Sequence, residues 1–461
     1  MKTFDYQTYL SPFTIRYGSK KMRYIWSEHH KRILWRKIWV AMAQVQNEAG
    51  IVAKKQLKDI VSYKEEINIE RAEKIEKEIK HDLMAEVKTF AEQCKIGGGK
   101  IHLGATSMDI EDNADILRVK ESLKIVRQLL KEGIGLWIEK VKRYKDLVCM
   151  GYTHLQPAEP TTLGYRFCLY LYDLFVDLQQ IDSFHLQGKG IKGAVGTSAS
   201  YKRLLAATGM SASSFEKKIM KRLNLDFVPI SSQTYPRKED YLVLNVLSSI
   251  AQSCYKFAFD LRILQSAPFG ELSEGFSKKQ VGSSAMPFKK NPITCEKICS
   301  LARYVSALSQ AAWENAANSL LERTLDDSAN RRIILPNAFL AVEEILISYN
   351  KVIKNLVVNE RKIRYNLEQY GPFSATEAIL MESVKKGADR QKMHEILRVI
   401  SLSAWQEIQN GRANPLEKEL ITNKEIKKYL EQKTVEKLLN IKNHIGDAPE
   451  KALNLIKIIK L

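Results

Sequence analysis

Long runs with a single apolar face constrain the fold of this chain more than any other feature of its sequence. Apolar residues recur every three or four positions from Ile116 to Val141, which is the pattern of one long amphipathic helix. Four more runs of this kind cover 166–186, 241–264, 292–321 and 333–357. Together with the scarcity of strand-like runs, they predict an all-α fold centred on a bundle of long helices.

The flanking sequences divide the chain into three mostly helical domains. An N-terminal domain of 1–110 ends in the glycine-rich stretch I-G-G-G-K-I-H-L-G-A-T-S, and the bundle domain covers 111–360. The C-terminal domain of 361–461 opens near Y-G-P-F-S-A-T-E. Pro336 lies near the predicted start of the fifth long helix, where proline is tolerated. Glycine, proline, serine and asparagine content predicts loops at 188–200, 268–282 and 410–415.

The composition is that of an ordinary globular protein, with 45% hydrophobic and 27% charged residues among 461. No stretch of about 18 consecutive apolar residues occurs, so we expect no membrane span. The N-terminal sequence M-K-T-F-D-Y-Q-T-Y-L lacks the apolar region of a signal peptide. Six cysteines are scattered without a C-x-x-C pair, which is typical of buried thiols in a reducing compartment. We therefore expect a cytoplasmic protein.

The formal net charge of +19 favours anionic partners. Most of the excess is lysine in helical stretches where both signs alternate, as in E-E-I-N-I-E-R-A-E-K-I-E-K-E-I-K, which indicates a solvated helix surface. No basic stripe is interleaved with aromatic residues. The pattern favours a phosphate-bearing small molecule over nucleic acid, and generic DNA binding stays the alternative.

Gly188, Gly190 and Gly193 match the pattern G-x-G-x-x-G literally. A dinucleotide fingerprint follows a strand and opens a helix inside a βαβ unit. Here the motif follows a predicted helix that ends in D-S-F-H-L-Q, and no parallel-strand pattern surrounds it. A glycine-rich turn after a helix C-terminus explains these residues, so we expect no nucleotide cofactor at this motif.

The stretch that combines the most chemically active groups is G-S-S-A-M-P-F-K-K-N-P, from Gly282 to Pro292. Its last two residues fit a helix start, with Asn291 as the N-cap and Pro292 as the first helical residue. That interpretation leaves the small residues before them unexplained. A loop with two serines and two lysines at a helix N-terminus can close over an anionic ligand.

This stretch resembles the signature G-S-S-x-M-P-x-K-x-N-P of the fumarase/aspartase superfamily, and within it that of the adenylosuccinate lyase family. The order of chemistry makes the match highly specific. The resemblance runs from about Arg16 to about residue 400. The other matching segments are G-Y-T-H-L-Q-P-A-E-P-T-T (151–162), K-H-D-L-M-A-E-V (80–87), H-L-G-A-T-S-M-D (102–109), S-Q-T-Y-P-R-K (232–238) and E-R-T-L-D-D-S-A-N-R-R (322–332).

The resemblance implies a C–N lyase of purine nucleotide biosynthesis. Members of the family split adenylosuccinate into AMP and fumarate by β-elimination. They usually also release fumarate from the succinyl-aminoimidazole-carboxamide ribotide (SAICAR), giving AICAR. By resemblance, Ser283 is the base and His154 is the acid that protonates the leaving nitrogen. Because a free serine is too weak a base, backbone N–H groups of the closed loop and Lys289 would stabilise its alkoxide, while Glu296 could hold the imidazolium form of His154.

The resemblance also implies where the substrate binds. Arg323, Ser328 and Arg332 would form a phosphate clamp, because arginine matches phosphate oxygens bidentately. Without the resemblance, the same segment is a charged helix face whose arginines pair with Asp326 or Asp327. The remaining implied substrate contacts are the nucleotide-binding pair Arg16 and Tyr17, then Lys80, His81 and Asp82, the succinyl hydrogen-bond donors Thr106, Ser107 and Gln233, and finally Lys289, Asn291 and Lys297, with Met286 in support.

Two lysines depart from the family pattern. Lys80 stands where the family often has arginine, and Lys297 stands where some members have it. Lysine keeps the positive charge but loses the planar fork of the guanidinium. We therefore expect substrate affinity, or the preference between the two purine substrates, to differ from that of relatives.

The resemblance further implies a homotetramer whose long helices form a central bundle and whose sites combine residues of different subunits. It implies no cofactor, and since no histidine pair has metal-ligand spacing, we expect no metal. Argininosuccinate lyase, aspartase and fumarase are rival interpretations, since they share the loop but bind no nucleotide phosphate. A non-catalytic structural or nucleic-acid-binding protein is another, against which the intact Ser283, His154, Lys289 and Asn291 argue.

Overall fold

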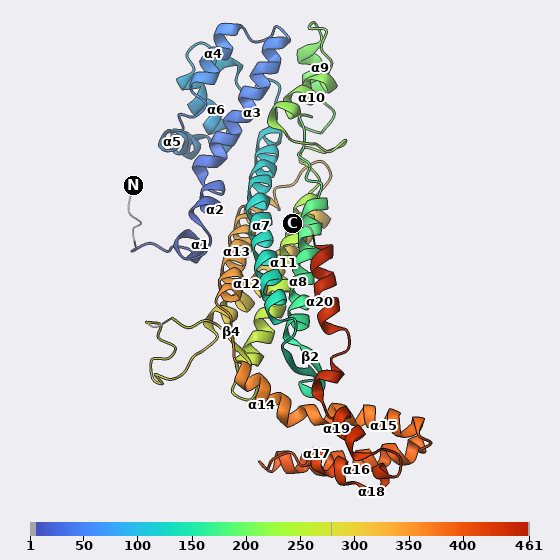
Figure 1. Cartoon of the computed structure of the whole chain (residues 1–461). Helices are drawn as coiled ribbons and strands as arrows, with labels where there is room; N and C mark the ends of the chain where they lie inside the picture. The colour runs from blue at the N-terminus through green and yellow to red at the C-terminus, as the bar shows by residue number, and fades with distance from the viewer. Residues whose placement is uncertain (1–5, 278, 460–461) are drawn as a thin grey trace. The chain divides into compact units, whose positions relative to one another are not determined.

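The computed structural model describes residues 6–277 and 279–459. The predicted all-α class is confirmed, and within the described residues five long helices correspond to the five predicted runs (Figure 1). These helices are α7 (Ser107–Tyr144), α8 (Leu163–Ser183), α11 (Lys238–Gln265), α12 (Ile293–Ala317) and α13 (Ser328–Lys354).

Shorter helices occupy most of the remaining described chain. Before and between the long helices lie α1 (Pro12–Ile15), α2 (Lys20–Ile25), α3 (Glu28–Glu48), α4 (Lys54–Ser62), α5 (Ile69–Ile79), α6 (Asp82–Gln93), the 3₁₀ turn Gly98–Lys100, α9 (Ala199–Leu205) and α10 (Ala212–Leu223). After them lie α14 (Glu360–Tyr370), the 3₁₀ turn Gly371–Ser374, α15 (Ala375–Lys385), α16 (Arg390–Gln409), α17 (Leu416–Thr422), α18 (Lys424–Lys427), α19 (Gln432–Leu438), the 3₁₀ turn Ile441–His444 and α20 (Ala448–Ile458).

The described strands form two short antiparallel pairs. β1 (Val148–Thr153) and β2 (Gln156–Thr162) make a hairpin, and β3 (Leu272–Ser273) pairs with β4 (Val357–Val358). The hairpin was not predicted from the sequence. Its second strand contains two prolines, which a two-stranded sheet accommodates because both of its strands are edges.

Packing divides the chain into two compact units, each assembled from separate stretches of sequence. One unit comprises the residues up to Leu130, Asp177–Gln252 and Ser300–Ile347, and the other comprises Lys131–Val176, Ser253–Cys299 and the chain from Ser348 onward. Each of the five long helices contributes residues to both units. The division into three sequential domains stays a prediction.

In the unit that contains the N-terminal helices, the core is formed by the inner faces of α3, α6, α9 and α10. Trp39 and Phe90 have ring centroids 6.2 Å apart, and Tyr201 lies 5.4 Å from Phe215. The capping serine of α3, Ser27, accepts a hydrogen bond from the His30 backbone N–H at 3.1 Å, which fixes where this helix begins.

In the other unit, four of the long helices share an aromatic centre. Trp137 of α7 has ring centroids 5.1 Å from Phe167 of α8 and 4.9 Å from Phe257 of α11. Its indole N–H donates to the Tyr349 hydroxyl of α13 at 2.9 Å. A separate cluster of buried aliphatic side chains holds α15 to α19 together. Burial of such large side chains is the main stabilising term of a helical core.

Helix α13 differs from its predicted form at one end. It begins at Ser328, so Pro336 lies inside the helix rather than in its first turn, and the predicted tolerance of a start position does not apply. Because proline has no N–H, the carbonyl of Arg332 has no helical partner four residues later. Among the described helices, α13 alone is long and apolar enough to cross a membrane, but 72% of that apolar window is buried within the protein, as in a core helix.

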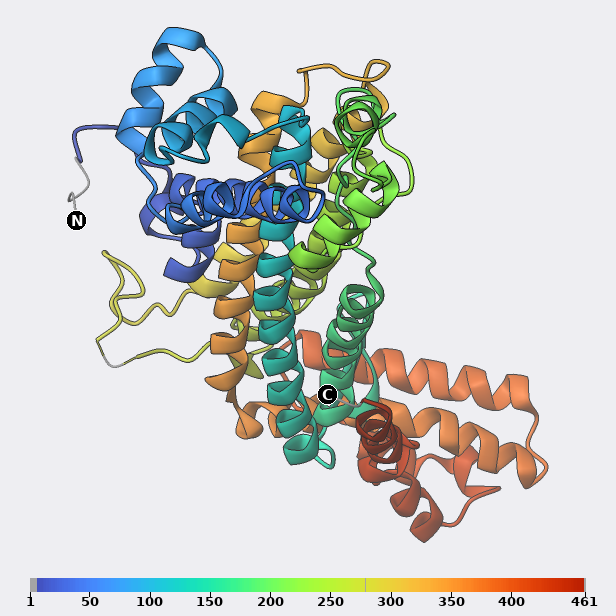
Figure 2. The same cartoon turned by 90° about the horizontal axis from the view of Figure 1, so that it is seen from above.

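An irregular segment joins β3 to α12 and carries the Gly282–Pro292 sequence. Figures 1 and 2 both show it as a loop that stands away from the helix that follows it. Its apolar side chains are exposed, with Phe288 at 81% and Val281 at 75% of full accessibility. The loop predicted from glycine, proline and serine content is therefore present, and it extends to the start of α12.

Candidate active site

The hydroxyl of Ser283 lies at a turn of the irregular loop. Its Oγ accepts hydrogen bonds from the backbone N–H of Ala285 at 3.3 Å and of Met286 at 3.0 Å. Two backbone donors aimed at one oxygen favour its negatively charged form, as in an oxyanion hole. The local geometry thus provides the kind of stabilisation that a serine alkoxide requires.

The neck of the loop is closed by Asn291. Its side-chain Nδ2 donates to the carbonyl of Gly282 at 2.9 Å. A Cβ atom at Gly282 would lie 2.0 Å from the carbonyl oxygen of Lys289, so only glycine fits at this crossing. Lys289 itself is exposed on the outer side of the neck.

The predicted N-cap role of Asn291 is wrong. Helix α12 begins at Ile293, and the buried carboxylate of Glu274 accepts from the backbone N–H groups of Thr294 at 3.2 Å and Cys295 at 2.6 Å. A carboxylate interacts more favourably with the positive end of the helix dipole than a neutral amide does. The side chain of Asn291 instead closes the neck of the loop by donating to the Gly282 carbonyl. Glu274 could not be predicted as the cap from local sequence, because it precedes the helix by nineteen residues.

His154 occupies the tip of the β1–β2 hairpin. It forms the two-residue turn with Leu155, and both residues have positive φ angles, 52° and 60°. A turn of this kind strongly prefers asparagine or glycine, and leucine is disfavoured there. Non-glycine residues held in this region cluster at functional sites, where surrounding structure maintains them. The backbone conformation of the exposed His154 therefore supports a functional role, and it shares its positive φ with Lys80 and His102 among others.

Nothing in the described part of a single chain holds the ring of His154. It makes no hydrogen bond or ion pair with the described residues, and so the expected contact with Glu296 is absent within this chain. Glu296 is exposed in the first turn of α12, and Lys297 beside it is half-buried. The role of Glu296 stays a prediction.

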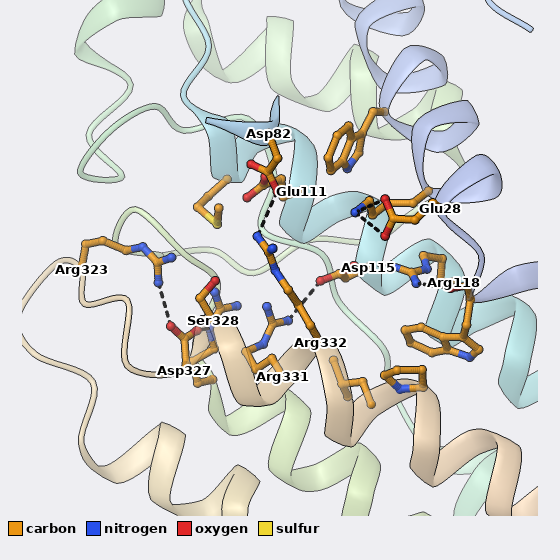
Figure 3. Close-up of a pocket in the computed structure, with 17 residues that line it drawn as sticks. Glu28, Asp82, Glu111, Asp115, Arg118, Arg323, Asp327, Ser328, Arg331 and Arg332 are labelled. Carbon is orange, nitrogen blue, oxygen red and sulfur yellow. Dashed lines mark hydrogen bonds and ion pairs between the residues drawn. The ribbon is translucent and has the colours of Figure 1, made fainter. Parts of the chain in front are cut away.

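A cavity of about 150 Å³ lies among α3, the start of α6, α7 and α13 (Figure 3). It contains four of the predicted substrate contacts: Asp82, Arg323, Ser328 and Arg332. The other lining residues are Trp26, Glu28, Lys31, Trp35, Met108, Glu111, Asp115, Arg118, Arg237, Asp327, Arg331, Leu335 and Pro336.

The three clamp residues converge on this cavity as the resemblance implies. Arg323 Nη1 lies 3.0 Å from Asp327 Oδ1, and Arg332 Nη2 lies 2.9 Å from Asp82 Oδ2. The pairing of Arg323 with Asp327 is also what the plain charged-helix interpretation expects. Ser328 is the first residue of α13, and its hydroxyl has no hydrogen-bond partner among the described residues. Both guanidiniums thus already hold an anion in the absence of substrate.

A buried network supports the clamp from behind. Asp327 bridges Arg323 to Arg237, whose Nε lies 2.5 Å from Asp327 Oδ2, and Arg237 also donates to Asp112 at 3.0 Å. Although burial pushes the pKa of Asp327 upward, the guanidiniums of Arg237, Arg331 and Arg323 hold it below its usual value. Asp327 is therefore a permanent anion that fixes Arg323. No role was predicted for Arg237 or Asp112, although Arg237 lies within the matching segment 232–238 and Asp112 follows the segment 102–109 by three residues.

Lys80 and His81 lie where α5 passes into α6. Lys80 is the left-handed C-cap of α5, with φ 56°, and His81 Nδ1 accepts from the Met84 backbone N–H at 3.4 Å as the N-cap of α6. Both side chains are exposed, and neither lines the cavity. Only Asp82, the next residue, reaches it.

Thr106, Ser107 and Gln233 form a second group near the cavity residues. Gln233 Nε2 donates to Thr106 Oγ1 at 3.5 Å, and Ser107 is the first residue of α7. The backbone N–H of Gln233 donates to the carbonyl of Glu322 at 3.1 Å, which ties this group to the segment that carries Arg323. The structure therefore brings together the predicted succinyl contacts of two separate segments and ties them to the segment of the clamp.

Arg16 and Tyr17 lie outside this cavity, at the end of α1. The Tyr17 carbonyl accepts from Arg23 Nη1 at 3.0 Å, and its ring lies edge-on to Phe13 with centroids 5.8 Å apart. The Ser19 backbone N–H donates to Glu343 at 2.7 Å, which anchors the segment on α13. Arg16 is exposed and makes no ion pair within the described residues.

The glycine-rich turn that mimics a dinucleotide fingerprint encloses a protein carboxylate. The backbone N–H groups of Lys192 and Gly193 donate to Asp109 at 3.1 Å each, and the Tyr201 hydroxyl donates at 2.8 Å. Lys189 makes a buried ion pair with the same carboxylate. The donors that could cradle a phosphate are thus occupied, in agreement with a structural turn.

No group of three or more histidine, cysteine, aspartate or glutamate side chains in residues 6–277 and 279–459 is arranged to hold a metal ion. All six cysteines are buried. The cavity in Figure 3 is lined by guanidiniums and carboxylates, and the guanidiniums suit an anionic ligand.

Comparisons with known proteins extend this picture to the whole chain. Residues 10–306 match a family described as lyase, and 372–452 match the adenylosuccinate lyase C-terminus. The chain is 38% identical to the adenylosuccinate lyase of Schistosoma mansoni, over 91% of this chain and 88% of the relative. It is 36% identical to that of Saccharomyces cerevisiae (98% and 95%) and 35% identical to that of Archaeoglobus fulgidus (97% and 98%).

Solved structures of lower identity share the fold. A fumarate lyase from Mesorhizobium sp. BNC1 has a TM-score of 0.84 at 21% identity, covering 98% of this chain and 99% of its own. The β-carboxy-cis,cis-muconate cycloisomerase of Acinetobacter calcoaceticus has a TM-score of 0.84 at 20% identity, with 97% and 100% covered. The sequence matches go further than the shared fold, and they show that the chain belongs to the adenylosuccinate lyase family of C–N lyases.

Proposed function

We propose that this protein cleaves adenylosuccinate into AMP and fumarate. The observation that carries the proposal is the convergence of Arg323, Ser328 and Arg332 on one cavity, which suits a phosphate ester. The other lyases of the superfamily act on substrates without a nucleotide phosphate. Relatives that carry the name adenylosuccinate lyase at 35–38% identity over nearly the whole chain support the same substrate.

The reaction needs a base for a weakly acidic carbon next to a carboxylate. Ser283, as an alkoxide, removes that proton, and the N–H groups of Ala285 and Met286 stabilise the oxygen while it is charged. The electrons of the broken C–H bond form the double bond of fumarate. The electrons of the C–N bond pass to the leaving nitrogen, which takes a proton from His154. One proton is thus accepted and one is donated in each turnover.

The substrate is held at both ends. Arg323 and Arg332 bind the phosphate through paired N–H donors, and the free hydroxyl of Ser328 adds a hydrogen bond. Lys289 and Asn291 hold the carboxylates of the succinyl group. The other succinyl contacts and the nucleotide-binding pair are Thr106, Ser107, Gln233, His81, Lys80, Lys297, Arg16 and Tyr17.

The same machinery accepts SAICAR. That ribotide carries the same succinyl group on nitrogen and the same phosphate. A site that binds these two groups does not strongly distinguish the heterocycles that lie between them. Lys80 and Lys297 each supply an ammonium group, where the family often (Lys80) or in some members (Lys297) has a guanidinium. Loss of the planar fork shifts the ratio of the two activities.

The active protein is a cytoplasmic homotetramer. The exposed Phe288, Val281 and Met286 of the loop support this, because a neighbouring subunit would cover them. In the tetramer, the loop, the histidine turn and the clamp that complete one site come from different subunits. Light scattering tests this directly: a mass near four times 52.8 kDa supports it, and a monomer mass contradicts it.

Ultraviolet spectroscopy tests the substrate assignment. The purified protein is mixed with adenylosuccinate, and the absorbance change is compared with chromatographic detection of AMP and fumarate. Argininosuccinate, aspartate and malate are tested in parallel. Turnover of adenylosuccinate alone supports the proposal. Turnover of one of the other three without adenylosuccinate contradicts it.

A further inference from the structure

One carboxyl group in the wall of the cavity has no part in the clamp. Glu111 lies on α7, one turn before Asp115, and it is half-buried. Figure 3 shows its carboxyl beside that of Asp82, where Arg332 enters the cavity from α13. No catalytic or binding role was assigned to Glu111 on the basis of the sequence.

Glu111 differs from the other carboxyl groups that line the cavity in having no cation as a partner. Glu28 pairs with Lys31 and Arg32, Asp82 with Arg332, Asp115 with Arg118, and Asp327 with Arg237. Glu111 makes no hydrogen bond or ion pair within residues 6–277 and 279–459. It is therefore a polar group in the cavity wall that the protein itself leaves unsatisfied.

Its surroundings keep Glu111 neutral. Burial, and then the carboxyl groups of Asp82 from α6 and of Asp115 and Asp112 from its own helix, raise the pKa of Glu111 to about 8, while Arg332 of α13 lowers it. At neutral pH the side chain therefore carries a proton. A protonated carboxyl can donate one hydrogen bond, which an ionised one cannot.

The charge of the cavity suits a phosphate monoester better when Glu111 is neutral. Six cationic side chains and five carboxyl groups line the cavity. With Glu111 neutral, the lining cations exceed the lining carboxylates by two, and although Asp112 and Asp240 behind the wall pair with Arg237 and Arg331, this state leaves the most positive charge for a phosphate monoester of charge about −2. With Glu111 ionised, the excess falls to one, and a carboxylate faces the dianion.

We propose that Glu111 is a specificity-determining residue that donates a hydrogen bond to the substrate phosphate when protonated and repels it when ionised. This inference rests on the proposed function, because it takes the cavity as the phosphate site. Glu111 acts on the same dianion as Arg323 and Arg332, from the opposite wall. It makes nucleotide binding depend on pH in the range just above neutrality.

The test is calorimetric titration of AMP into the full-length protein at pH 7, 8 and 9. The phosphate of AMP is fully ionised over most of this range, because its second pKa is about 6. One pH unit above its pKa, about one-tenth of Glu111 remains protonated, so AMP binding to the native protein weakens by about ten-fold between pH 7 and 9. Adenosine, which lacks the phosphate, does not show this loss.

Two variants separate Glu111 from other titrating groups. Glu111→Gln keeps the hydrogen-bond donor at every pH, so AMP affinity stays constant from pH 7 to 9. Glu111→Ala binds AMP more weakly at pH 7 but equally lacks the pH dependence. Glu132→Gln changes an exposed glutamate of the same helix and behaves as the native protein does.

Parallel pH profiles for the native protein and Glu111→Gln would overturn the role of Glu111. If the native protein cleaves adenylosuccinate while the profiles are parallel, only this inference fails. If the native protein neither cleaves adenylosuccinate nor binds AMP, the proposed function fails and the inference fails with it. The two failures are thus distinguishable in one set of samples.

Discussion

Arg332 and Asp82, which are 250 residues apart in the sequence, form an ion pair of 2.9 Å at the mouth of the cavity. The pair joins the start of α6 to the start of α13. It keeps the Arg332 guanidinium near the phosphate position before any substrate binds, although its side chain is 63% exposed. A substrate phosphate then has to share or replace a carboxylate that is already bound.

Substitution of Arg332 tests the clamp. Arg332→Ala removes a charge-assisted hydrogen bond worth about 1.5–3 kcal/mol, so KM for adenylosuccinate rises by roughly ten- to a hundred-fold. Arg332→Lys keeps the charge but loses the planar fork of the guanidinium. Its KM therefore lies between that of the native protein and that of Arg332→Ala. Steady-state kinetics measures both. An unchanged KM in Arg332→Ala places the phosphate elsewhere.

Variants of the turn formed by His154 and Leu155 separate the effect of backbone strain from the effect of the histidine side chain. Asparagine tolerates a positive φ, so His154→Asn keeps the turn and removes the acid, and kcat falls by about 10²- to 10⁴-fold. Leu155→Gly relieves the strained position and keeps His154, so it retains kcat. It also gains about 0.5–1 kcal/mol in free energy of unfolding, because the exposed leucine loses little packing.

Urea unfolding and steady-state assays check this pair of variants together. Native-like turnover in His154→Asn excludes histidine as the acid. A large loss of turnover in Leu155→Gly instead indicates that the leucine side chain contacts the substrate.

Arg237, the buried arginine behind the clamp, stabilises the fold and also holds Asp327, which positions Arg323. Arg237→Ala leaves the carboxylates of Asp112 and Asp327 without their partner, and the free energy of unfolding falls by about 3–5 kcal/mol. Arg71→Ala breaks an exposed pair with Glu92 and leaves the unfolding midpoint nearly unchanged. Equal midpoints for the two variants would show that the buried network adds nothing to stability.

His102 gives the fold a dependence on acid pH. Burial lowers the pKa of His102 to about 4, and its Nδ1 accepts a hydrogen bond from the Trp39 indole at 3.1 Å. Between pH 6.5 and 4 the unfolded chain binds a proton that the folded chain does not. The contribution of neutral His102 to the free energy of unfolding is therefore fully present above pH 6.5. About 3 kcal/mol of it is lost as the pH falls to 4.

The variant His102→Asn checks this assignment, since asparagine suits the φ of 67° and does not titrate. Its free energy of unfolding loses less between pH 6.5 and 4 than that of the native protein. The comparison is made by urea titration at each pH. The same loss in both proteins assigns the acid sensitivity to other groups.

The long helices could be predicted from the sequence because each keeps one apolar face over many turns. The run that ends at Val141 became α7, whose Trp137 reaches the aromatic centre that Tyr349 of α13 shares. The ends of the helices were predicted less accurately. For example, α13 begins at Ser328, so that Pro336 lies inside the helix and not near its start. An end depends on a few capping contacts, such as Glu274 at α12, that come from distant sequence.

Many residues of the candidate site could be predicted from the sequence motifs, but their contacts with one another could not. The motif residues Arg323 and Arg332 could be named in advance, whereas Asp327 was expected only in the alternative charged-helix interpretation, and Asp82 was predicted as a substrate contact rather than as the partner of Arg332. Glu111 could not be identified in advance, because its burial and its proximity to Asp82 arise only on folding, although Asp112 and Asp115 are its neighbours in the sequence. The hairpin under His154 was hidden by the prolines in its second strand.

The most direct test of the account is the turnover of adenylosuccinate by Ser283→Ala beside the native protein, with AMP binding measured on both. The account predicts that the native protein releases AMP and fumarate. It predicts that the variant binds AMP with unchanged affinity, while its kcat falls by at least about a hundred-fold. A variant that keeps most of the native kcat would contradict Ser283 as the base, and with it the catalytic role of the loop.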